Sequence, residues 1–334
     1  MKLAVVVLNY NGVDLLAKFL PTLVQHSAGA KLYLADNGST DNSVAFVAEH
    51  FPEITCIRLE KNLGFAGGYN AALQQISADV YCLLNSDVAV TANWIAPNLA
   101  WLNENSSHVA CSPKILSYKN PEYFEHAGAA GGFLDVFGYP FCRGRIYDCV
   151  EKDNGQYNQT TEVFWATGAC LFIKSKVFHE LGGFDADFFA HMEEIDLCWR
   201  LKNRAYKIAY IADSHVFHLG GGTLSIYSPF KLFLNFRNSL FMLVKNYRQS
   251  NLALKILQRL VLDGFAALLF LCKGDWRYIG AIVKAHWAFF KALPKFMQKR
   301  RLENANIKTP SMDLYPKSIA FDFFVQGKKY FKEL

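Results

Sequence analysis

Short apolar runs alternate with segments of helical spacing over residues 3–84, and this alternation restricts the fold more than any other feature of the chain. Residues 3–8 are apolar, 14–25 have apolar side chains at helical spacing, and 31–35 are again apolar, which predicts a β-α-β unit. The alternation continues as helix, strand, helix and strand over 44–50, 54–59, 67–75 and 80–84. Apolar strands separated by helices indicate an α/β fold, with a Rossmann-like, mostly parallel central sheet and helices on both faces.

The pattern changes after this unit. Residues 103–161 are rich in glycine and aromatic residues, which predicts irregular strands and loops. Residues 163–174 predict a buried strand that contains Gly168, and 207–212 predict a further strand. The composition changes near residue 246, so we expect one domain over 1–245 and a helical region over 246–334.

Composition excludes several classes of protein. The chain has 334 residues, 52% of them hydrophobic and 19% charged, so it can bury a large core and is not disordered. A net charge of +6 fits an anionic ligand or membrane surface but is too small to indicate nucleic acid. The eight cysteines form no CxxC pair, and the first residues lack a signal-peptide pattern, so we expect a cytoplasmic protein with reduced thiols.

Polar turns follow three of the predicted strands, at residues 9–12, 36–41 and 85–87. Ligands of such sheets bind beyond the carboxyl ends of the strands, so these turns are candidate binding loops. Asp36 has two interpretations: it stabilises its own turn, or it accepts the imide N–H of a uracil or thymine base. Spacing alone does not decide between them.

The glycine-rich segment 62–70 (NLGFAGGYN) precedes a predicted helix. It lacks the Gly-Lys-Ser/Thr ending of a P-loop and does not match GxGxxG, so it is a generic glycine-rich turn. The helix N-terminus, expected near Gly67, would present backbone N–H groups to an anion.

A divalent cation has two candidate ligands in this sequence. Asp87 is the only acid of its turn, so Mg²⁺ or Mn²⁺ would need further oxygen ligands, which a bound diphosphate supplies. His218, which precedes a run of glycines, is a candidate protein ligand. The alternative for His218 is a structural histidine with satisfied hydrogen bonds.

An acidic triplet lies among apolar residues in the segment 184–201. If a helix begins near residue 192, Glu193, Asp196 and Arg200 share one face, where the guanidinium can pair with the acids. Glu194 then lies on the apolar side with residues 197, 198 and 201, which would raise its pKa and suit a general base. The alternative is a helix start that favours acids in its first turn.

Together these motifs resemble the family 2 glycosyltransferases of GT-A fold, and within them the bacterial rhamnosyltransferase-like branch. The resemblance covers residues 3–245 and depends on the order of several short motifs: VVLNYNG, ADNGSTDNS, KNLGFAGGYNAAL, LLNSDV, TGACLFI, GGFDADFFAHMEEIDLCWRL, HLGGGT and FRN. The chain differs from the family in having one carboxylate in NSD, and Glu194 where the family has aspartate.

The resemblance implies a role for each matching residue. Glu194 would be the catalytic base, with Glu193 and Asp196 as alternatives, and Asp87 and His218 would hold Mn²⁺ or Mg²⁺. Residues of the nucleotide-sugar pocket would be Asn9, Asn11, Asp36 (on the base), Asn62, Gly64, Gly67, Asn70, Asn85, Asp87, Gly168 and Arg237.

The expected activity is inverting transfer of a sugar, with rhamnose favoured by the resemblance, from a dTDP- or UDP-sugar. The expected acceptor is a hydroxyl of a glycan or lipid-linked saccharide in cell-surface polysaccharide synthesis. Two alternatives remain open. A sugar nucleotidyltransferase should carry an arginine-containing glycine-rich loop after its first strand, where this chain has NYNGVD. A non-catalytic relative acting as a membrane assembly partner should lack Asp87, Glu194 or His218.

The helical region after residue 246 is rich in leucine, aromatic and basic residues, but its longest uncharged apolar run, 264–272, is too short to span a bilayer. We expect helices on the inner face of the bacterial cytoplasmic membrane, and the alternative is helices packed on the catalytic domain. The residues expected to enter the membrane are Trp276, Trp287, Phe289 and Phe290. Those expected near anionic headgroups are Lys284, Lys291, Lys295, Lys299, Arg300 and Arg301.

Overall fold

The computed structural model describes residues 1–220, 228–307 and 313–334. In its first half the elements are β1 (Leu3–Asn9), α1 (Val13–His26), β2 (Lys31–Asp36), α2 (Ser43–His50), β3 (Thr55–Arg58), α3 (Gly64–Leu73), β4 (Val80–Asn85), β5 (Val88–Val90), α4 (Ala96–Glu104), β6 (His108–Ser117), β7 (Gly132–Leu134), β8 (Pro140–Cys142), β9 (Arg145–Ile146), β10 (Cys149–Val150) and β11 (Thr161–Glu162). The later elements are β12 (Cys170–Lys174), α5 (Ser175–Glu180), the 3₁₀ turn η1 (Ala186–Phe188), α6 (Glu193–Asn203), β13 (Lys207–His218), α7 (Pro229–Asn246), α8 (Leu252–Cys272), α9 (Trp276–Asn304), α10 (Ile319–Phe324) and η2 (Phe331–Glu333).

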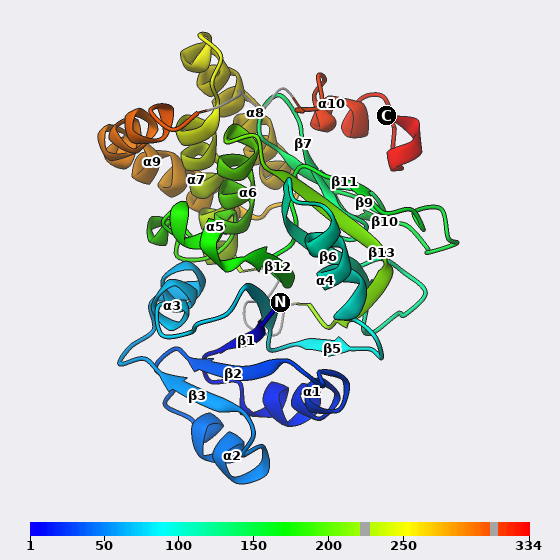
Figure 1. Ribbon diagram of the computed structural model, residues 1–334. Helices are drawn as coiled ribbons and strands as arrows, with labels where there is room; N and C mark the ends of the chain where they lie inside the picture. The colour runs from blue at the N-terminus through cyan, green and yellow to red at the C-terminus, as the bar shows by residue number, and fades with distance from the viewer. Residues whose placement is uncertain (221–227, 308–312) are drawn as a thin grey trace.

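The predicted parallel unit is present. The main sheet has the order β11-β13-β6-β12-β4-β1-β2-β3, and β4, β1, β2 and β3 are parallel neighbours (Figure 1). All of the helices and strands predicted over residues 3–84 form, although α3 begins at Gly64, earlier than the predicted start at Gly67. The strand order places β1 between β4 and β2, so the turns after these strands lie at one edge of the sheet.

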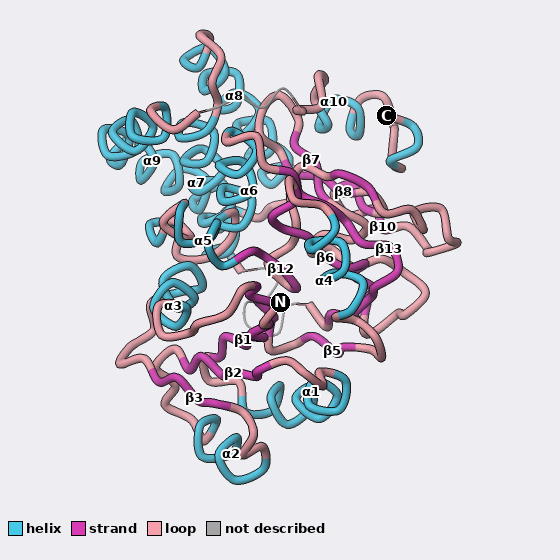
Figure 2. Tube along the Cα trace, in the orientation of Figure 1, coloured by secondary structure: helices cyan, strands magenta, loops and turns pink. Residues whose placement is uncertain are grey.

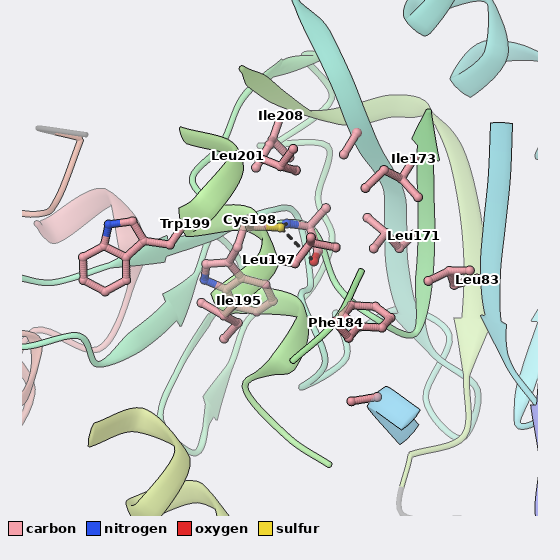
Figure 3. Packing of buried hydrophobic residues seen from close by; sticks show 14 of the residues in the cluster. Leu83, Leu171, Ile173, Phe184, Ile195, Leu197, Cys198, Trp199, Leu201 and Ile208 are labelled. Atoms are coloured by element: carbon pink, nitrogen blue, oxygen red, sulfur yellow. Dashed lines mark hydrogen bonds between the residues drawn. The ribbon is translucent and has the colours of Figure 1, made fainter. Parts of the chain in front are cut away.

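Helices cover both faces of this sheet, because successive residues of β1 point to opposite sides. Ala4 and Val6 pack in one core with α3 and α6, whereas Val5 and Val7 pack in another with α1 and α2. Figure 3 shows the first core, where side chains of α6 such as Leu197 and Leu201 meet the β12 residues Leu171 and Ile173. The α/β fold class predicted from the alternation is therefore correct.

Two strands predicted for the second half need correction. The predicted strand 163–174 is shorter, because only Cys170–Lys174 pairs with β4 and β6, and Gly168 lies in the turn before it. β13 is longer than predicted and continues to His218 beyond an irregularity between Ile211 and His215.

The region predicted as irregular strands and loops also holds β6, a buried ten-residue strand. Ser112, Pro113 and Lys114 interrupt its apolar pattern, which hides it from sequence inspection. Pro113 lies opposite Ile211 of β13 but beyond the two β6 residues, Ala110 and Cys111, that pair with β12, so it has a paired strand on one side only.

Helices α7, α8 and α9 form a group at one end of the molecule, next to α6 (Figures 1 and 2). α9 packs on α7 through stacked rings of Phe241 and Phe296, whose centroids are 3.8 Å apart. Among the described residues, none of the helices combines the length and apolarity needed to span a membrane.

Part of the membrane prediction is wrong. Phe289 is 0% exposed, and Lys299 binds Asp185 and Asp187 in the segment before α6. Lys295 also binds Asp187, and Arg300 donates to backbone carbonyls of α7 and Tyr247. These four residues hold α9 on the domain, as in the alternative of helices packed on the core. Trp276, Trp287 and Phe290 are exposed, at 70%, 67% and 52%.

Candidate active site

Asp87, His218 and Glu125 form a chain of buried polar side chains at the edge of the sheet. His218 Nε2 lies 3.0 Å from Asp87 Oδ1, and His218 Nδ1 lies 2.8 Å from Glu125 Oε2. The pairing of β5 with β13 produces this contact, because it places His218 opposite Val88, next to Asp87. Asp87 and His218, predicted as the metal ligands, are therefore neighbours.

The protonation state of His218 depends on whether a proton or a cation lies between its Nε2 and Asp87. Burial lowers the pKa of His218, but hydrogen bonds to Asp87 and Glu125 outweigh it and raise the pKa to about 10. Without a cation, the two carboxylates favour the imidazolium form of His218. A divalent cation between Nε2 and Asp87 would take the place of the proton on Nε2.

The donor atoms fit such a cation. Adjacent ligands of an octahedral Mg²⁺ or Mn²⁺ lie about 3 Å apart when each metal–ligand bond is about 2.1 Å, and the Asp87–His218 distance is 3.0 Å. No cluster of three or more ligating side chains exists within residues 1–220, 228–307 and 313–334. Diphosphate oxygens and water would have to complete the coordination. The rest of the HLGGGT motif after Gly220 lies outside the described residues.

The turn around Gly168 lies between Asp87 and Glu194. The Asn85 N–H donates to the Ala169 carbonyl, which holds the Gly168 turn beside the turn that carries Asp87. A Cβ on Gly168 would lie 3.7 Å from the Glu194 Cβ and 3.2 Å from the Phe65 ring. Asp87 and Glu194 thus flank the same glycine turn.

The three acids of α6 have different surroundings. Asp196 is 0% exposed and binds Arg200, Lys245 and Asn246, so the predicted Asp196–Arg200 pair is confirmed. Engaged in this way, Asp196 is not available as a base, which corrects one of the alternatives.

Glu193 and Glu194 occupy apolar surroundings, as predicted for Glu194. Burial raises the pKa of Glu194 to about 7, and burial and the charge of Glu194 raise the pKa of Glu193 well above its usual range. No donor among the described residues reaches Oε2 of either acid, but Glu193 is buried whereas Glu194 is half-buried. Glu194 is the acid better placed to meet a substrate.

The backbone before α6 adopts left-handed conformations that only tertiary contacts sustain. Phe189, His191 and Met192 have φ of 66°, 68° and 71°. Asn238 of α7 fixes this loop, because its side-chain amide donates to the carbonyls of Phe188, Ala190 and His191. α7 therefore positions the loop that leads into Glu193 and Glu194.

The predicted base-binding residues lie where β1 and β2 end side by side. Asn9 pairs with Asp36 in the register, and the Asn9 amide donates to Asp36 Oδ1. The Ser39 N–H donates to Asp36 Oδ2, and Asn11 Oδ1 accepts from Thr40 N–H. Asn9 Oδ1 is buried, and no donor within the described part of the chain reaches it. This oxygen is a candidate acceptor for a ligand N–H.

Backbone N–H groups of the glycine-rich turn, expected to be open to an anion, already have acceptors within the protein. Asn62 Oδ1 already accepts the Gly64 N–H, and the Phe189 carbonyl accepts the Ala66 N–H, so these donors are not open to an anion. Gly64 has φ of 73° and contacts Phe189 so closely that a Cβ would lie 2.5 Å from its ring. Gly67 lies inside α3, against the side chain of residue 63, and not at its start.

Two further residues predicted for the nucleotide-sugar pocket bind the segment before α6. The Asn70 side-chain amide donates to the Phe184 carbonyl at 2.8 Å, and its oxygen accepts from the Phe184 N–H at 2.9 Å. The Arg237 guanidinium donates to the carbonyls of Asp187 and Phe188 and lies over the rings of Phe233 and Phe241. Both residues hold the loop before α6, and neither contacts Asp87 or His218 in the described structure.

Sequence inspection missed two residues of the site. Glu125 is absent from the predicted set because it follows β6 in the region interpreted as loops. Asn37 lies in the polar turn predicted over residues 36–41, and its side chain bonds Asn62, Gly64 and residue 63 and so joins the β2 and α3 turns. The available signal for Asn37 is its position directly after β2, whereas Glu125 lies apart from the end of β6 and has no such signal.

Comparison with known proteins agrees with the resemblance in the sequence. The profile of the family described as Glycosyl transferase family 2 matches residues 4–182, more than half of the chain. An N-acetylglucosaminyl-diphospho-decaprenol L-rhamnosyltransferase of Mycobacterium tuberculosis (strain CDC 1551 / Oshkosh) is 26% identical over 235 residues, covering 65% of this chain and 75% of that protein.

Solved structures share the fold. GalNAc-T7 with UDP, GalNAc and Mn²⁺ superposes with a TM-score of 0.60 at 17% identity, over 75% of this chain and 48% of that one, so this chain spans about half of its length. Residues 1–349 of TarS from S. aureus, in complex with UDP-GlcNAc, give a TM-score of 0.56 at 14% identity, over 95% and 99% of the two chains. These similarities confirm the predicted GT-A fold.

Proposed function

Because this chain belongs to glycosyl transferase family 2, we propose that it is an inverting enzyme that moves a sugar from a dTDP- or UDP-sugar to a hydroxyl of a glycan or lipid-linked acceptor. One observation carries the proposal. The Asp87–His218 pair, which fits a divalent cation, and Glu194, whose pKa is raised to about 7, flank the same glycine turn at the carboxyl edge of the sheet.

The donor would bind along the ends of β1, β2 and β4. Asp36 and the buried Asn9 Oδ1 offer acceptors to the imide N–H of a uracil or thymine base. Asp87 and His218 would hold Mn²⁺ or Mg²⁺. The cation would neutralise the negative charge that develops on the leaving diphosphate.

The acceptor would be activated by Glu194. Its ionised carboxylate removes the proton of the acceptor hydroxyl as that oxygen bonds to the anomeric carbon and the bond from that carbon to the diphosphate oxygen breaks. A single displacement from the side opposite the leaving group inverts the anomeric configuration. A product with the anomeric configuration of the donor would contradict this scheme.

The rhamnosyltransferase among the relatives, which its name links to a decaprenol-bound acceptor, supports rhamnose and a lipid-linked saccharide as the substrates. The setting would be cell-surface polysaccharide synthesis. We propose that the protein lies at the inner face of the bacterial cytoplasmic membrane, because α8 exposes an apolar face.

The apolar and polar faces of α8 are reversed relative to an ordinary surface helix. Two of its three charged residues, Arg259 and Asp263, are buried in a mutual ion pair, and Asp263 also accepts from Tyr139. The opposite face exposes apolar side chains at helical spacing: Leu254, Leu257, Val261, Phe265 and Leu268, each more than half exposed. The basic residues marked as exposed in α8, α9 and the turn between them are Lys273, Arg277, Lys284, Lys291, Arg301 and Lys295, the last of which pairs with Asp187. An apolar face with basic neighbours suits an anionic membrane surface.

A thermal-shift titration with UDP, dTDP, GDP and ADP, each with and without Mn²⁺, tests the donor site. We expect a Mn²⁺-dependent rise in the melting temperature with UDP or dTDP, because a ligand that binds only the folded state stabilises it by mass action. Asp87→Ala should lose this rise. The absence of any shift with all four nucleotides would overturn the proposed donor site.

A further inference from the structure

The side chain of Glu125 reaches His218 from the side opposite Asp87. Its segment is fixed to β6, because the Glu125 N–H donates to the Ile115 carbonyl. Its carboxylate accepts from His218 Nδ1 at 2.8 Å and from the Ala127 N–H at 2.6 Å, both on Oε2. The side chain is 10% exposed.

Gly220 closes the other side of the Glu125 carboxylate. A Cβ on Gly220 would lie 2.7 Å from Glu125 Oε1, and Gly220 has φ of 69°, a conformation that favours glycine. The carboxylate is therefore held between Ala127, His218 and Gly220 and has little room to turn away from the imidazole.

This arrangement determines which nitrogen of His218 carries a proton when a cation is bound. An ionised carboxylate only accepts hydrogen bonds, and Glu125 Oε2 already accepts the Ala127 N–H, so the Nδ1 that faces it is the donor. The lone pair of His218 is then on Nε2, which points at Asp87 Oδ1, 3.0 Å away. A ligating histidine oriented by a carboxylate on its other nitrogen is a recurrent feature of metal sites.

We propose that Glu125 is a positioning residue for the divalent cation: it holds His218 with Nδ1 protonated and Nε2 directed at the position shared with Asp87. This inference rests on the proposed cation site. Glu125 acts only through His218 and does not contact the cation. The alternative is that Glu125 merely stabilises the fold around a buried histidine.

Manganese binding separates the two roles. Mn²⁺ would be titrated into the full chain in the presence of UDP or dTDP, with unbound Mn²⁺ measured by electron paramagnetic resonance. Glu125→Gln should weaken Mn²⁺ binding about 10- to 100-fold, the usual effect of removing such a partner. Glu122→Gln is the matched control, because Glu122 is 66% exposed and pairs with Lys152, and its affinity should equal that of the unaltered protein.

The outcomes are distinct. If the unaltered chain binds no Mn²⁺, the proposed cation site fails. If it binds Mn²⁺ and Glu125→Gln binds equally tightly, Glu125 has no positioning role even where the melting temperature falls.

A measurement on the unaltered chain does not depend on how the variant folds. With ¹⁵N-labelled histidine, Zn²⁺ as a diamagnetic cation and UDP or dTDP, nuclear magnetic resonance should find the proton on Nδ1 of His218 and the metal on Nε2. A proton on Nε2 would overturn the proposal.

Discussion

Three acids within one turn of α6 differ because each helical step rotates the side chain by about 100°. Asp196 points into a buried ion-pair cluster, Glu193 into the core, and Glu194 toward the Gly168 turn. The surroundings of each carboxyl, and not the residue type, separate a structural acid from a candidate base.

Replacing Glu194 by Gln should lower kcat by about 10²- to 10⁴-fold, because the amide cannot accept the acceptor proton. Mn²⁺-dependent nucleotide binding should stay unchanged, since Glu194 is on the acceptor side. The assay is sugar transfer from the donor that the thermal-shift titration selects. Activity within a few-fold of the unaltered protein would assign the base to another residue.

The rate should depend on pH in the direction set by the raised pKa of Glu194, about 7. The base acts ionised, and burial favours its protonated form, so kcat/KM should rise with pH through about 7 and then level. The profile would be measured between about pH 5 and pH 9. A midpoint near 4.5, the ordinary value for glutamate, would contradict the assignment.

At the scale of elements, ion pairs join the loop before α6 to α7 and α9. Lys245 of α7 binds both Asp185 and Asp196, and Lys299 of α9 binds Asp185 and Asp187. Burial raises the pKa of Asp185, but the charges of Lys245 and Lys299 outweigh it, and the pKa falls well below its usual range. The position of Glu194 therefore depends on helices remote in sequence.

Lys245→Met should lower the free energy of unfolding by roughly 3–5 kcal/mol, because it leaves buried carboxylates with fewer cations. Lys295→Met is the matched control. Its ammonium also pairs with an acid of this loop but is 58% exposed, so the loss should stay within about 1 kcal/mol. Urea unfolding measures both. Equal losses would show that burial of the Lys245 pair has no energetic consequence.

The apolar face of α8 makes a separate prediction. The full chain should float with vesicles that contain anionic lipid and much less with neutral vesicles. The triple variant Leu257→Ser, Phe265→Ser and Leu268→Ser should lose this binding while its melting temperature is kept, because these side chains are 59%, 61% and 52% exposed.

Gel filtration of the same proteins distinguishes another occupant of this face. A dimer that the triple variant converts to monomer, without vesicle binding by the unaltered chain, would assign the face to a second copy. Failure to bind anionic vesicles would contradict the membrane proposal.

At the scale of the whole molecule, the helical region contributes to the core of the catalytic domain. Removing residues after 247 should lower the melting temperature sharply or abolish soluble expression, because Phe289 and Phe296, 0% and 1% exposed, leave Phe241 uncovered. An unchanged melting temperature would show that the catalytic domain folds alone. The point variants of α8, and not truncation, are therefore the suitable test of membrane binding.

The sequence by itself determined the parallel half of the sheet, the polar turns at its edge and the apolar surroundings of Glu194. These features depend on spacing along one strand or helix, which the periodicity of side chains records directly. Asp87 could be predicted as a candidate because it follows a recognisable strand, and His218 because it precedes a run of glycines.

Only the tertiary structure decided what these residues contact. Glu125 and His218 are separated by 93 positions, and Asn70 and Phe184 by 114. Such contacts come from strand order and helix packing, which no local pattern encodes. The same reason explains why Arg237 and Asn70 support the loop before α6, and why α8 presents its apolar face outward.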